Sequence, residues 1–203
     1  MAAQEMTKRL LVLGLTGAGK SSFINMLFQA DLAPVDDFVA CTQSVAEYEL
    51  RHAGESLVLV DSPGFGDALD RDDSYEESVC SFCLTKAVHG VIYVSRVSES
   101  RIRPSEKKAL AVARDAIGCA RLEASFFVFT RCAHLEKDDL ILRAETRFRQ
   151  MHQVLTATCG SRVNLGGIMC IDNLTDYSRD DINRMRSLLL GWRKIAEHHR
   201  VVV

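Results

Sequence analysis

Residues 14–21 have the types and spacing of a loop that binds phosphate. They read GLTGAGKS, with four residues between Gly14 and Gly19 and then Lys20 and Ser21. In such a loop, backbone N–H groups at a helix N-terminus surround the anion, Lys20 neutralises the terminal phosphates and the Ser21 hydroxyl ligates Mg²⁺. The apolar run LLVL precedes the loop and SSFINMLF follows it, as the strand–loop–helix context requires. The predicted nucleotide contacts are Gly14, Thr16, Gly17, Ala18, Gly19, Lys20, Ser21 and Ser22.

A second motif, VDSPGFGD, covers residues 60–67 at the end of an apolar run. Asp61 at a strand tip is suited to hold Mg²⁺, usually through water, and the N–H of Gly64 to meet a γ-phosphate. This spacing from the phosphate loop is that of a GTPase rather than a kinase. Phe65 stands where Ras-like enzymes carry a glutamine that orients water. We therefore predict slow hydrolysis in cis, unless a partner or a second copy supplies a polar group.

Between the two motifs, a GTPase needs a threonine on a mobile loop that closes over magnesium and the γ-phosphate. Thr42, in the segment ACTQS, is the predicted residue, and Ser44 is the alternative. The predicted metal ligands are therefore Ser21, Thr42 and Asp61. Lys20, Thr42 and Gly64 are predicted to act in catalysis.

Short apolar runs alternate with amphipathic stretches along the chain. Several runs are continuous and β-branched or aromatic, as in central strands that are covered on both faces. The segment Val45–Leu50, VAEYEL, instead alternates between apolar and polar residues. Only RHAGE separates it from the next apolar run, which predicts an antiparallel hairpin at the sheet edge. The predicted strands are Arg9–Gly14, Val45–Leu50, Ser56–Asp61, Gly90–Ser95, Ser125–Thr130 and Gly166–Ile171.

Helical spacing of apolar residues fills the gaps between most of these strands. One helix is predicted to begin at Pro104 and stop at Gly118, and another to follow Asp138. A last helix begins with a capping-box-like SRDD at Ser178 and carries an apolar stripe that runs on through Trp192 and Ala196. The sum predicts a single three-layer α/β domain over residues 1–203, with a six-stranded, mostly parallel sheet and one antiparallel edge strand.

Composition narrows the class of protein further. A net charge of −2 gives no reason to expect binding to nucleic acid or to an anionic membrane. Seven scattered cysteines indicate reduced thiols, with Cys80 and Cys83 packed on the inner face of a helix. The N-terminus lacks the apolar stretch of a signal peptide, and no run approaches the ~20 apolar residues of a bilayer span. We expect a cytoplasmic protein, and membrane association only through parts outside this chain.

The sequence contains DSPGFGDA, a following EESV helix, HGVIYV and RIRPSEKKAL. With these segments the chain, from about Lys8 to the final helix, resembles the immunity-associated GTPase family of animals. It is also similar to the relatives of that family, the chloroplast-import receptor GTPases and, more distantly, the septins. FVFTRCAHL, with Arg131 and His134, is similar to the segment that recognises guanine. MCIDN, ending at Asn173, resembles the last base-contacting loop. The family usually has an acid where this chain has His134, and a neutral imidazole cannot accept both guanine N–H groups.

The resemblance implies a P-loop NTPase G domain that binds GTP or GDP with Mg²⁺. It also implies dimerisation across the nucleotide face, with Arg101 and Arg103 as candidates for that interface and Arg103 as a predicted catalytic residue. The protein effector is unknown, and the cytosolic face of a membrane is a second expected location. Two other interpretations stay open: an ATPase or nucleotide kinase with relaxed base preference, and a scaffold that holds nucleotide without hydrolysing it.

Overall fold

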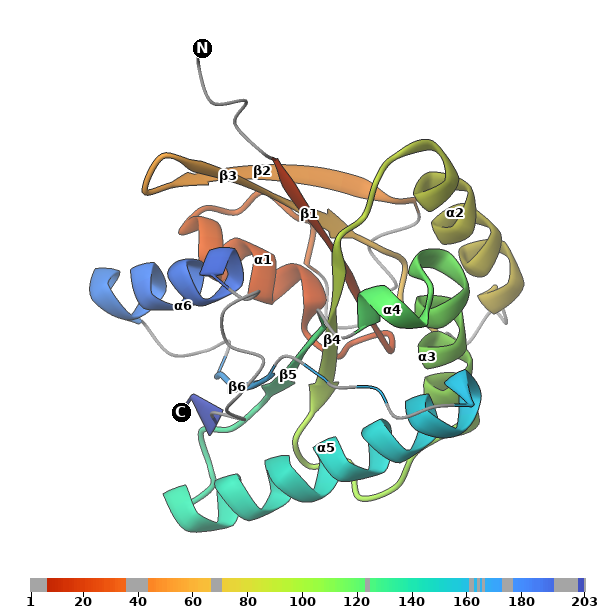
Figure 1. Cartoon of the computed structure of the whole chain (residues 1–203). Helices are drawn as coiled ribbons and strands as arrows, with labels where there is room; N and C mark the ends of the chain where they lie inside the picture. The colour runs from red at the N-terminus through yellow and green to blue at the C-terminus, as the bar shows by residue number, and fades with distance from the viewer. Residues whose placement is uncertain are drawn as a thin grey trace.

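The centre of the molecule is one sheet with strand order β2-β3-β1-β4-β5-β6-β7 (Figure 1). The computed structural model describes residues 7–35, 44–66, 71–122, 125–160, 163, 165, 167–172, 177–191 and 201–202. The strands are β1 (Lys8–Gly14), β2 (Ala46–His52), β3 (Glu55–Asp61), β4 (Gly90–Arg96), β5 (Phe126–Thr130), β6 (Gly167–Cys170) and β7 (Val201–Val202).

All the neighbouring strands pair in parallel except β2, which pairs antiparallel with β3. The six predicted strands are confirmed to within two residues at each end, and so is the hairpin. The sheet has one strand more than predicted, because Val201–Val202 pairs with β6. Two valines are too short a run to give a sequence pattern.

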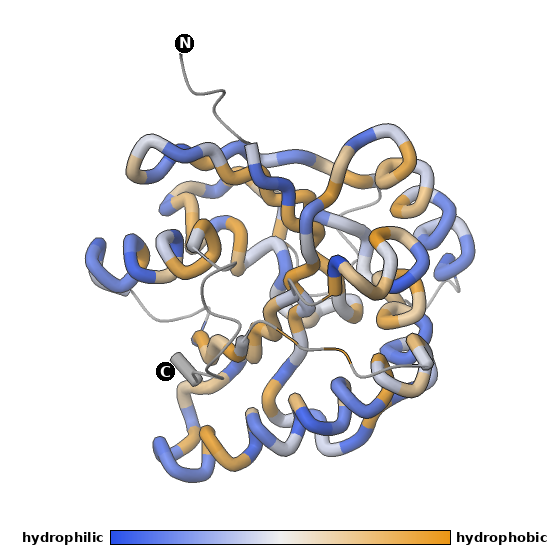
Figure 2. Tube along the Cα trace, viewed as in Figure 1, coloured by the Kyte–Doolittle hydropathy of each residue, from blue (hydrophilic) through white to orange (hydrophobic). Residues whose placement is uncertain are grey.

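Helices cover both faces of the sheet, which confirms the three-layer architecture (Figure 1). One apolar core joins alternate residues of the strands to α1 (Lys20–Phe28) and α6 (Arg179–Gly191). The other core joins the opposite strand face to α2 (Asp72–Thr85), α3 (Pro104–Ile117) and α5 (Lys137–Cys159), with the short α4 (Cys119–Leu122) beside them. Figure 2 shows the apolar residues gathered along the inner strands and on the helix sides that face them. No helix in the described part of the chain is long and apolar enough to cross a membrane.

The helix boundaries follow the residues that predicted them. Pro104 is the first residue of α3, and Gly118 caps its C-terminus with φ 79°. At the start of α6 the Ser178 hydroxyl accepts the N–H of Asp181 at 3.2 Å. The far end of the predicted apolar stripe, with Trp192 and Ala196, lies outside the described residues.

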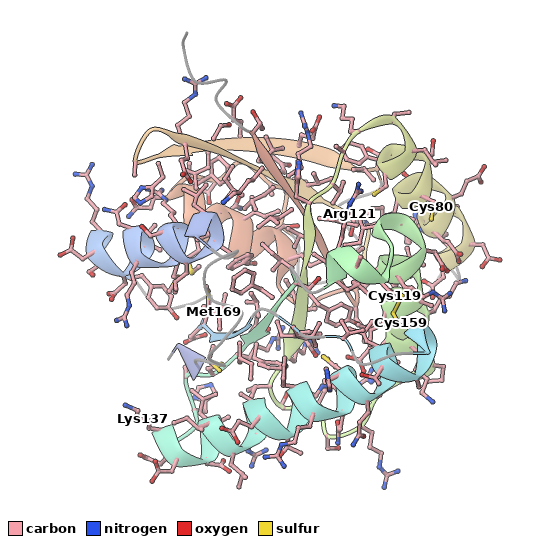
Figure 3. All side chains as sticks on the ribbon, viewed as in Figure 1. Cys80, Cys119, Arg121, Lys137, Cys159 and Met169 are labelled. Atoms are coloured by element: carbon pink, nitrogen blue, oxygen red, sulfur yellow. A yellow bond between two sulfur atoms is a disulfide. The ribbon has the colours of Figure 1, made fainter. Side chains whose placement is uncertain are left out.

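One prediction about cysteine is wrong. Cys119 and Cys159 form a disulfide that joins the start of α4 to the end of α5 (Figure 3). The two cysteines are 40 positions apart in the sequence, and no local pattern predicts their pairing. It depends on α4 and α5 both packing beside α3, which brings the two Cα atoms to 6.0 Å. Cys80 and Cys83 are free and pack against the core as predicted, and burial raises the pKa of Cys83 to about 11. Among the described residues, no group of three His, Cys, Asp or Glu side chains is arranged to hold a metal ion.

Helices α3 and α5 are also joined by an ion pair in the core. Arg147 donates to the carboxylate of Glu106, and both side chains are almost completely buried. The second carboxylate oxygen of Glu106 accepts the backbone N–H of Arg103 at 3.0 Å. The pair therefore fixes the first turn of α3, which follows directly from the loop after β4. A buried pair of this kind orients elements more reliably than it stabilises them.

Candidate functional site

The phosphate loop leaves the sheet at Gly14, the last residue of β1. A Cβ at this position would lie 2.2 Å from the carbonyl oxygen of Val94 on the neighbouring β4, so only glycine fits. The loop then turns back through a hydrogen bond from Ala18 N–H to the carbonyl of Leu15 at 3.1 Å. Gly19, with φ 94°, is the N-cap of α1. The predicted strand–loop–helix arrangement is therefore present, with the helix N-terminus at the loop.

Lys20 is the first residue of α1, and its side chain is only 6% exposed. Its Nζ donates to the carbonyl oxygens of Leu15 at 3.2 Å and Gly14 at 3.4 Å. Burial lowers the pKa of Lys20 to about 8, although the nearby Asp61 carboxylate acts in the opposite direction. An ammonium held at such a cost is stabilised by an anion bound beside it. The site thus fits a phosphate group electrostatically.

The two described candidates for metal ligation, Ser21 and Asp61, lie next to each other. The Ser21 hydroxyl donates to Oδ2 of Asp61 at 3.1 Å, and Asp61 is fully buried at the end of β3. Parallel pairing places Asp61 beside Val12 of β1, just below the loop. Hydroxyl and carboxylate oxygens are the ligands that Mg²⁺ prefers, so this pair fits the ion. The third predicted ligand, Thr42, lies outside the described residues.

The segment after Asp61 is hydrogen-bonded directly to the phosphate loop. The Thr16 hydroxyl donates to the carbonyl of Gly64 at 2.7 Å, and the Thr16 N–H to that of Phe65 at 2.9 Å. The N–H of Phe65 donates back to Gly14 at 3.2 Å. A Cβ on Gly64 would lie 2.6 Å from the Cα of Thr16. The two motifs predicted from the sequence thus form one continuous structure in which Gly64 must be glycine.

Phe65 has a structural role that the sequence comparison with Ras-like enzymes did not suggest. Its side chain is fully buried and belongs to the apolar core on the α2, α3 and α5 side of the sheet. Its backbone forms an isolated parallel bridge with Leu15. Phe65 is therefore an anchor that holds the segment down on the loop. The large apolar side chain at this position was the signal that could have predicted it.

The segment predicted to recognise the base follows β5, on the other side of β4. The Thr130 hydroxyl donates to the carbonyl of Ala18 at 2.8 Å and so ties the end of β5 to the phosphate loop. Arg131 has φ 60°, and both Arg131 and His134 are exposed. The structure thus brings these two predicted residues to the loop's edge of the sheet, and Asn173 lies outside the described residues. Sequence reasoning missed Thr130, whose contact joins residues 112 positions apart.

The loop between β4 and α3 carries the predicted interfacial arginines. Arg101 and Arg103 are exposed, and Arg103 pairs with Glu99 at 2.7 Å. Arg103 and Glu99 also line a small cavity of about 40 Å³ beside the phosphate loop, whose lining does not include Lys20, Ser21 or Asp61. Arg96, which no motif singled out, donates from Nε and Nη2 to the carbonyl of Gly17.

A family model described as 50S ribosome-binding GTPase matches residues 9–129, from β1 to the end of β5. The chain belongs to this GTPase family. The matched part of this GTPase domain includes the phosphate loop, the Asp61–Gly64 motif and the β4–α3 loop. The predicted relationship to the G domains of septins and chloroplast-import receptors is confirmed at the level of this family.

Relatives of the GTPase domain come from bacteria, amoebae and animals. YkfA of Escherichia coli is 41% identical over 64 residues, which are 32% of this chain and 22% of YkfA. GTP-binding protein A of Dictyostelium discoideum is 34% identical over 93 residues, 45% of this chain and 20% of that protein. Septin-2 of Bos taurus is 36% identical over 81 residues, 35% of this chain and 22% of the septin. The aligned part therefore spans about a fifth of the length of these relatives.

Solved structures share the fold over almost the whole chain. Toc33 from Arabidopsis thaliana, in complex with GDP and Mg²⁺, superposes with a TM-score of 0.75 at 17% identity, covering 94% of this chain and 84% of Toc33. Era, in complex with a nucleotide analogue and a piece of 16S ribosomal RNA, gives 0.67 at 13% identity, covering 92% and 56%. At these identities the likeness establishes the three-layer GTPase fold.

The buried Lys20 makes anion binding depend on pH. Below about pH 8 the free protein carries a charged Lys20 and affinity for Mg²⁺–GDP should stay constant. Above it, binding must take up a proton, because the phosphates favour the charged amine. Affinity should therefore fall as the pH rises above about 8, by at most about tenfold per pH unit. Calorimetric titration in two buffers of different ionisation enthalpy measures both the affinity and the proton uptake. Constant affinity and no proton uptake over this range would contradict the assignment of Lys20.

The burial of Phe65 predicts the outcome of restoring the Ras-like glutamine. Phe65→Gln should not speed hydrolysis, because the side chain faces the core, and it should lower the free energy of unfolding by about 3–5 kcal/mol. Phe65→Leu is the matched control and should cost less, about 1 kcal/mol. Urea unfolding and a phosphate-release assay on each variant test this. A glutamine variant as stable as wild type and faster in hydrolysis would show that the side chain turns toward the nucleotide.

Proposed function

We propose that this chain is a magnesium-dependent GTP-binding protein that hydrolyses GTP slowly and whose self-association is controlled by the bound nucleotide. The observation that carries the proposal is the buried Lys20 ammonium beside the Ser21–Asp61 pair, at a helix N-terminus. That combination supplies charge for the phosphates and oxygen ligands for the ion in one place. Membership of a GTPase family supports guanine nucleotide as the ligand.

Guanine preference is supported by the family and reduced by one residue. A neutral imidazole at His134 offers the base a single acceptor, whereas a carboxylate would accept two N–H groups. Losing an ion-assisted hydrogen bond costs about 1.5–3 kcal/mol, which loosens specificity without abolishing binding. Toc33 has been crystallised with GDP and Mg²⁺ and with Mg²⁺ and GMPPNP, which supports the same ligands here. We therefore propose a modest preference for GTP over ATP.

The buried Phe65 supports the proposal of slow hydrolysis. Residue 65 offers no group to orient the attacking water, because its phenyl ring lies in the core. Phe65 is equally consistent with a scaffold that holds nucleotide and never hydrolyses it. The two functions differ in whether a second copy restores turnover.

Self-association across the nucleotide face offers such a route. Dimerisation is important for the GTPase activity of the chloroplast components atToc33 and psToc159, and a Toc33 variant with one arginine replaced by alanine is dimerisation-deficient. In this chain the exposed Arg101 and Arg103 lie on the loop that borders the phosphate loop. Because the net charge of the chain is −2, we propose a protein effector rather than nucleic acid. We also propose a cytoplasmic location or the cytosolic face of a membrane.

The base preference is tested by identifying nucleotide that copurifies with the protein and by competing GTP against ATP. GTP should win by a modest margin. His134→Asp should widen that margin about tenfold, since it restores the second acceptor. If ATP competes equally with GTP before and after this change, guanine recognition is wrong and the ATPase alternative takes its place.

Hydrolysis and self-association are tested together by measuring turnover against protein concentration. Specific activity should rise as the chain dimerises, and sedimentation velocity should show dimer with a non-hydrolysable GTP analogue but monomer with GDP. Arg101→Ala should lower both the dimer fraction and the rise in activity. Arg149→Ala, an exposed arginine on α5, should change neither. Specific activity that stays near zero at all concentrations would favour the scaffold.

A further inference from the structure

Arg96 is the last residue of β4, and its guanidinium group lies against the phosphate loop. Nε and Nη2 donate to the carbonyl oxygen of Gly17 at 3.1 and 2.9 Å. Two donors of one rigid, planar group thus meet at a single oxygen of the loop. The contact is close, since a Cβ on Gly17 would lie 2.7 Å from Nη2.

The neighbouring acid, Glu99, is hydrogen-bonded to Arg103. Both oxygens of the Glu99 carboxylate accept Nη2 of Arg103, at 2.9 and 2.7 Å. Burial lowers the pKa of Arg96, and the positive charges of Arg131 and Arg103 act in the same direction, while the Glu99 carboxylate acts against them. An anion at the loop would favour the charged guanidinium.

Gly17 lies next to the residue that joins the phosphate loop to the predicted γ-phosphate contact. It follows Thr16, whose hydroxyl and N–H bind the Gly64–Phe65 segment, and Gly64 is the predicted γ-phosphate contact. Lys20, which is predicted to neutralise the terminal phosphates, and Ser21 lie further along the chain, in the first turn of α1. The small cavity lined by Thr16, Ala18, Ser95 and Arg96 adjoins the loop on the β4–α3 side, so tight side-chain packing does not support the loop there. Hydrogen bonds from Arg96 supply the support instead.

We propose that Arg96 is a positioning residue that keeps the Thr16–Gly17 end of the phosphate loop formed, and that it thereby favours a nucleoside triphosphate over a diphosphate. The inference rests on the proposed function, because it concerns the same nucleotide site. Arg96 touches the loop and not the reacting atoms. Its effect should appear in the affinity for the third phosphate rather than in the stability of the fold, since Arg96 is only half-buried.

The test is a titration of four proteins with Mg²⁺–GDP and with a Mg²⁺-bound, non-hydrolysable GTP analogue. Arg96→Met should weaken binding of the analogue by about tenfold, which is the loss expected for a hydrogen bond from a charged group, and should leave GDP binding within about twofold. Arg96→Lys keeps the charge but replaces the planar fork with a point donor, so it should recover only part of the loss. Arg149→Met, an exposed arginine on α5, should match wild type for both ligands. Thermal unfolding of each protein checks the fold.

The possible outcomes separate the inference from the proposed function. Wild-type protein that binds neither ligand would overturn the proposed function itself. Wild-type binding with an equal loss of GDP and analogue in Arg96→Met, or with no loss, would overturn the inference alone. Full recovery in Arg96→Lys would also overturn it, because the charge would then be sufficient without the two-point contact.

Discussion

The close approach of β1 and β4 at Gly14 is the constraint on which the rest of the site depends. The absence of a side chain there lets the phosphate loop start directly against the carbonyl of Val94, at the carboxyl edge of a parallel sheet. At that edge the ends of β3, β4 and β5 all come within reach of the loop. Gly64, Arg96 and Thr130 follow or end those three strands, and each is hydrogen-bonded to the loop or to its Thr16. The loop is thus held by the sheet, and its shape is set before any ligand arrives.

This attachment has a consequence for how a signal from the nucleotide would travel. The Asp61–Gly64 motif is joined to the phosphate loop through the backbone of Phe65 and the side chain of Thr16. A ligand that draws Gly64 toward a third phosphate must therefore change the hydrogen bonds of Thr16 as well. Because Phe65 stays in the core, the movement must take place around this anchor.

The strands and helices that could be predicted from the sequence are those marked by short local patterns of residues. Continuous apolar runs such as GVIYV placed the central strands, and the alternation in VAEYEL placed the antiparallel edge strand. Pro104 and Gly118 marked the ends of a helix. The spacing of Gly14, Lys20 and Ser21 predicted the loop geometry, because these glycines and polar groups serve one local turn.

Interactions between distant residues could not be predicted in this way. Arg96 and Thr130 lie 79 and 112 residues from their partners in the loop, and neither belongs to a pattern that names those partners. The disulfide between Cys119 and Cys159 depends on two helices that meet only in three dimensions. Phe65 was predicted to be unable to orient water, which stays a prediction, and its place in the core required knowledge of the residues beneath it.

These features together describe a site that is prepared to bind an anion. Lys20 is kept buried with its pKa lowered to about 8, an arrangement whose cost is relieved when an anion binds. Preformed donors of this kind favour tight association, since little ordering remains for the ligand to impose. At the position where Ras-like enzymes carry a glutamine that orients water, this chain has Phe65, which is buried in the core. Under the proposed function, such a site would keep its nucleotide after binding, and turnover would depend on a group that another molecule brings to it.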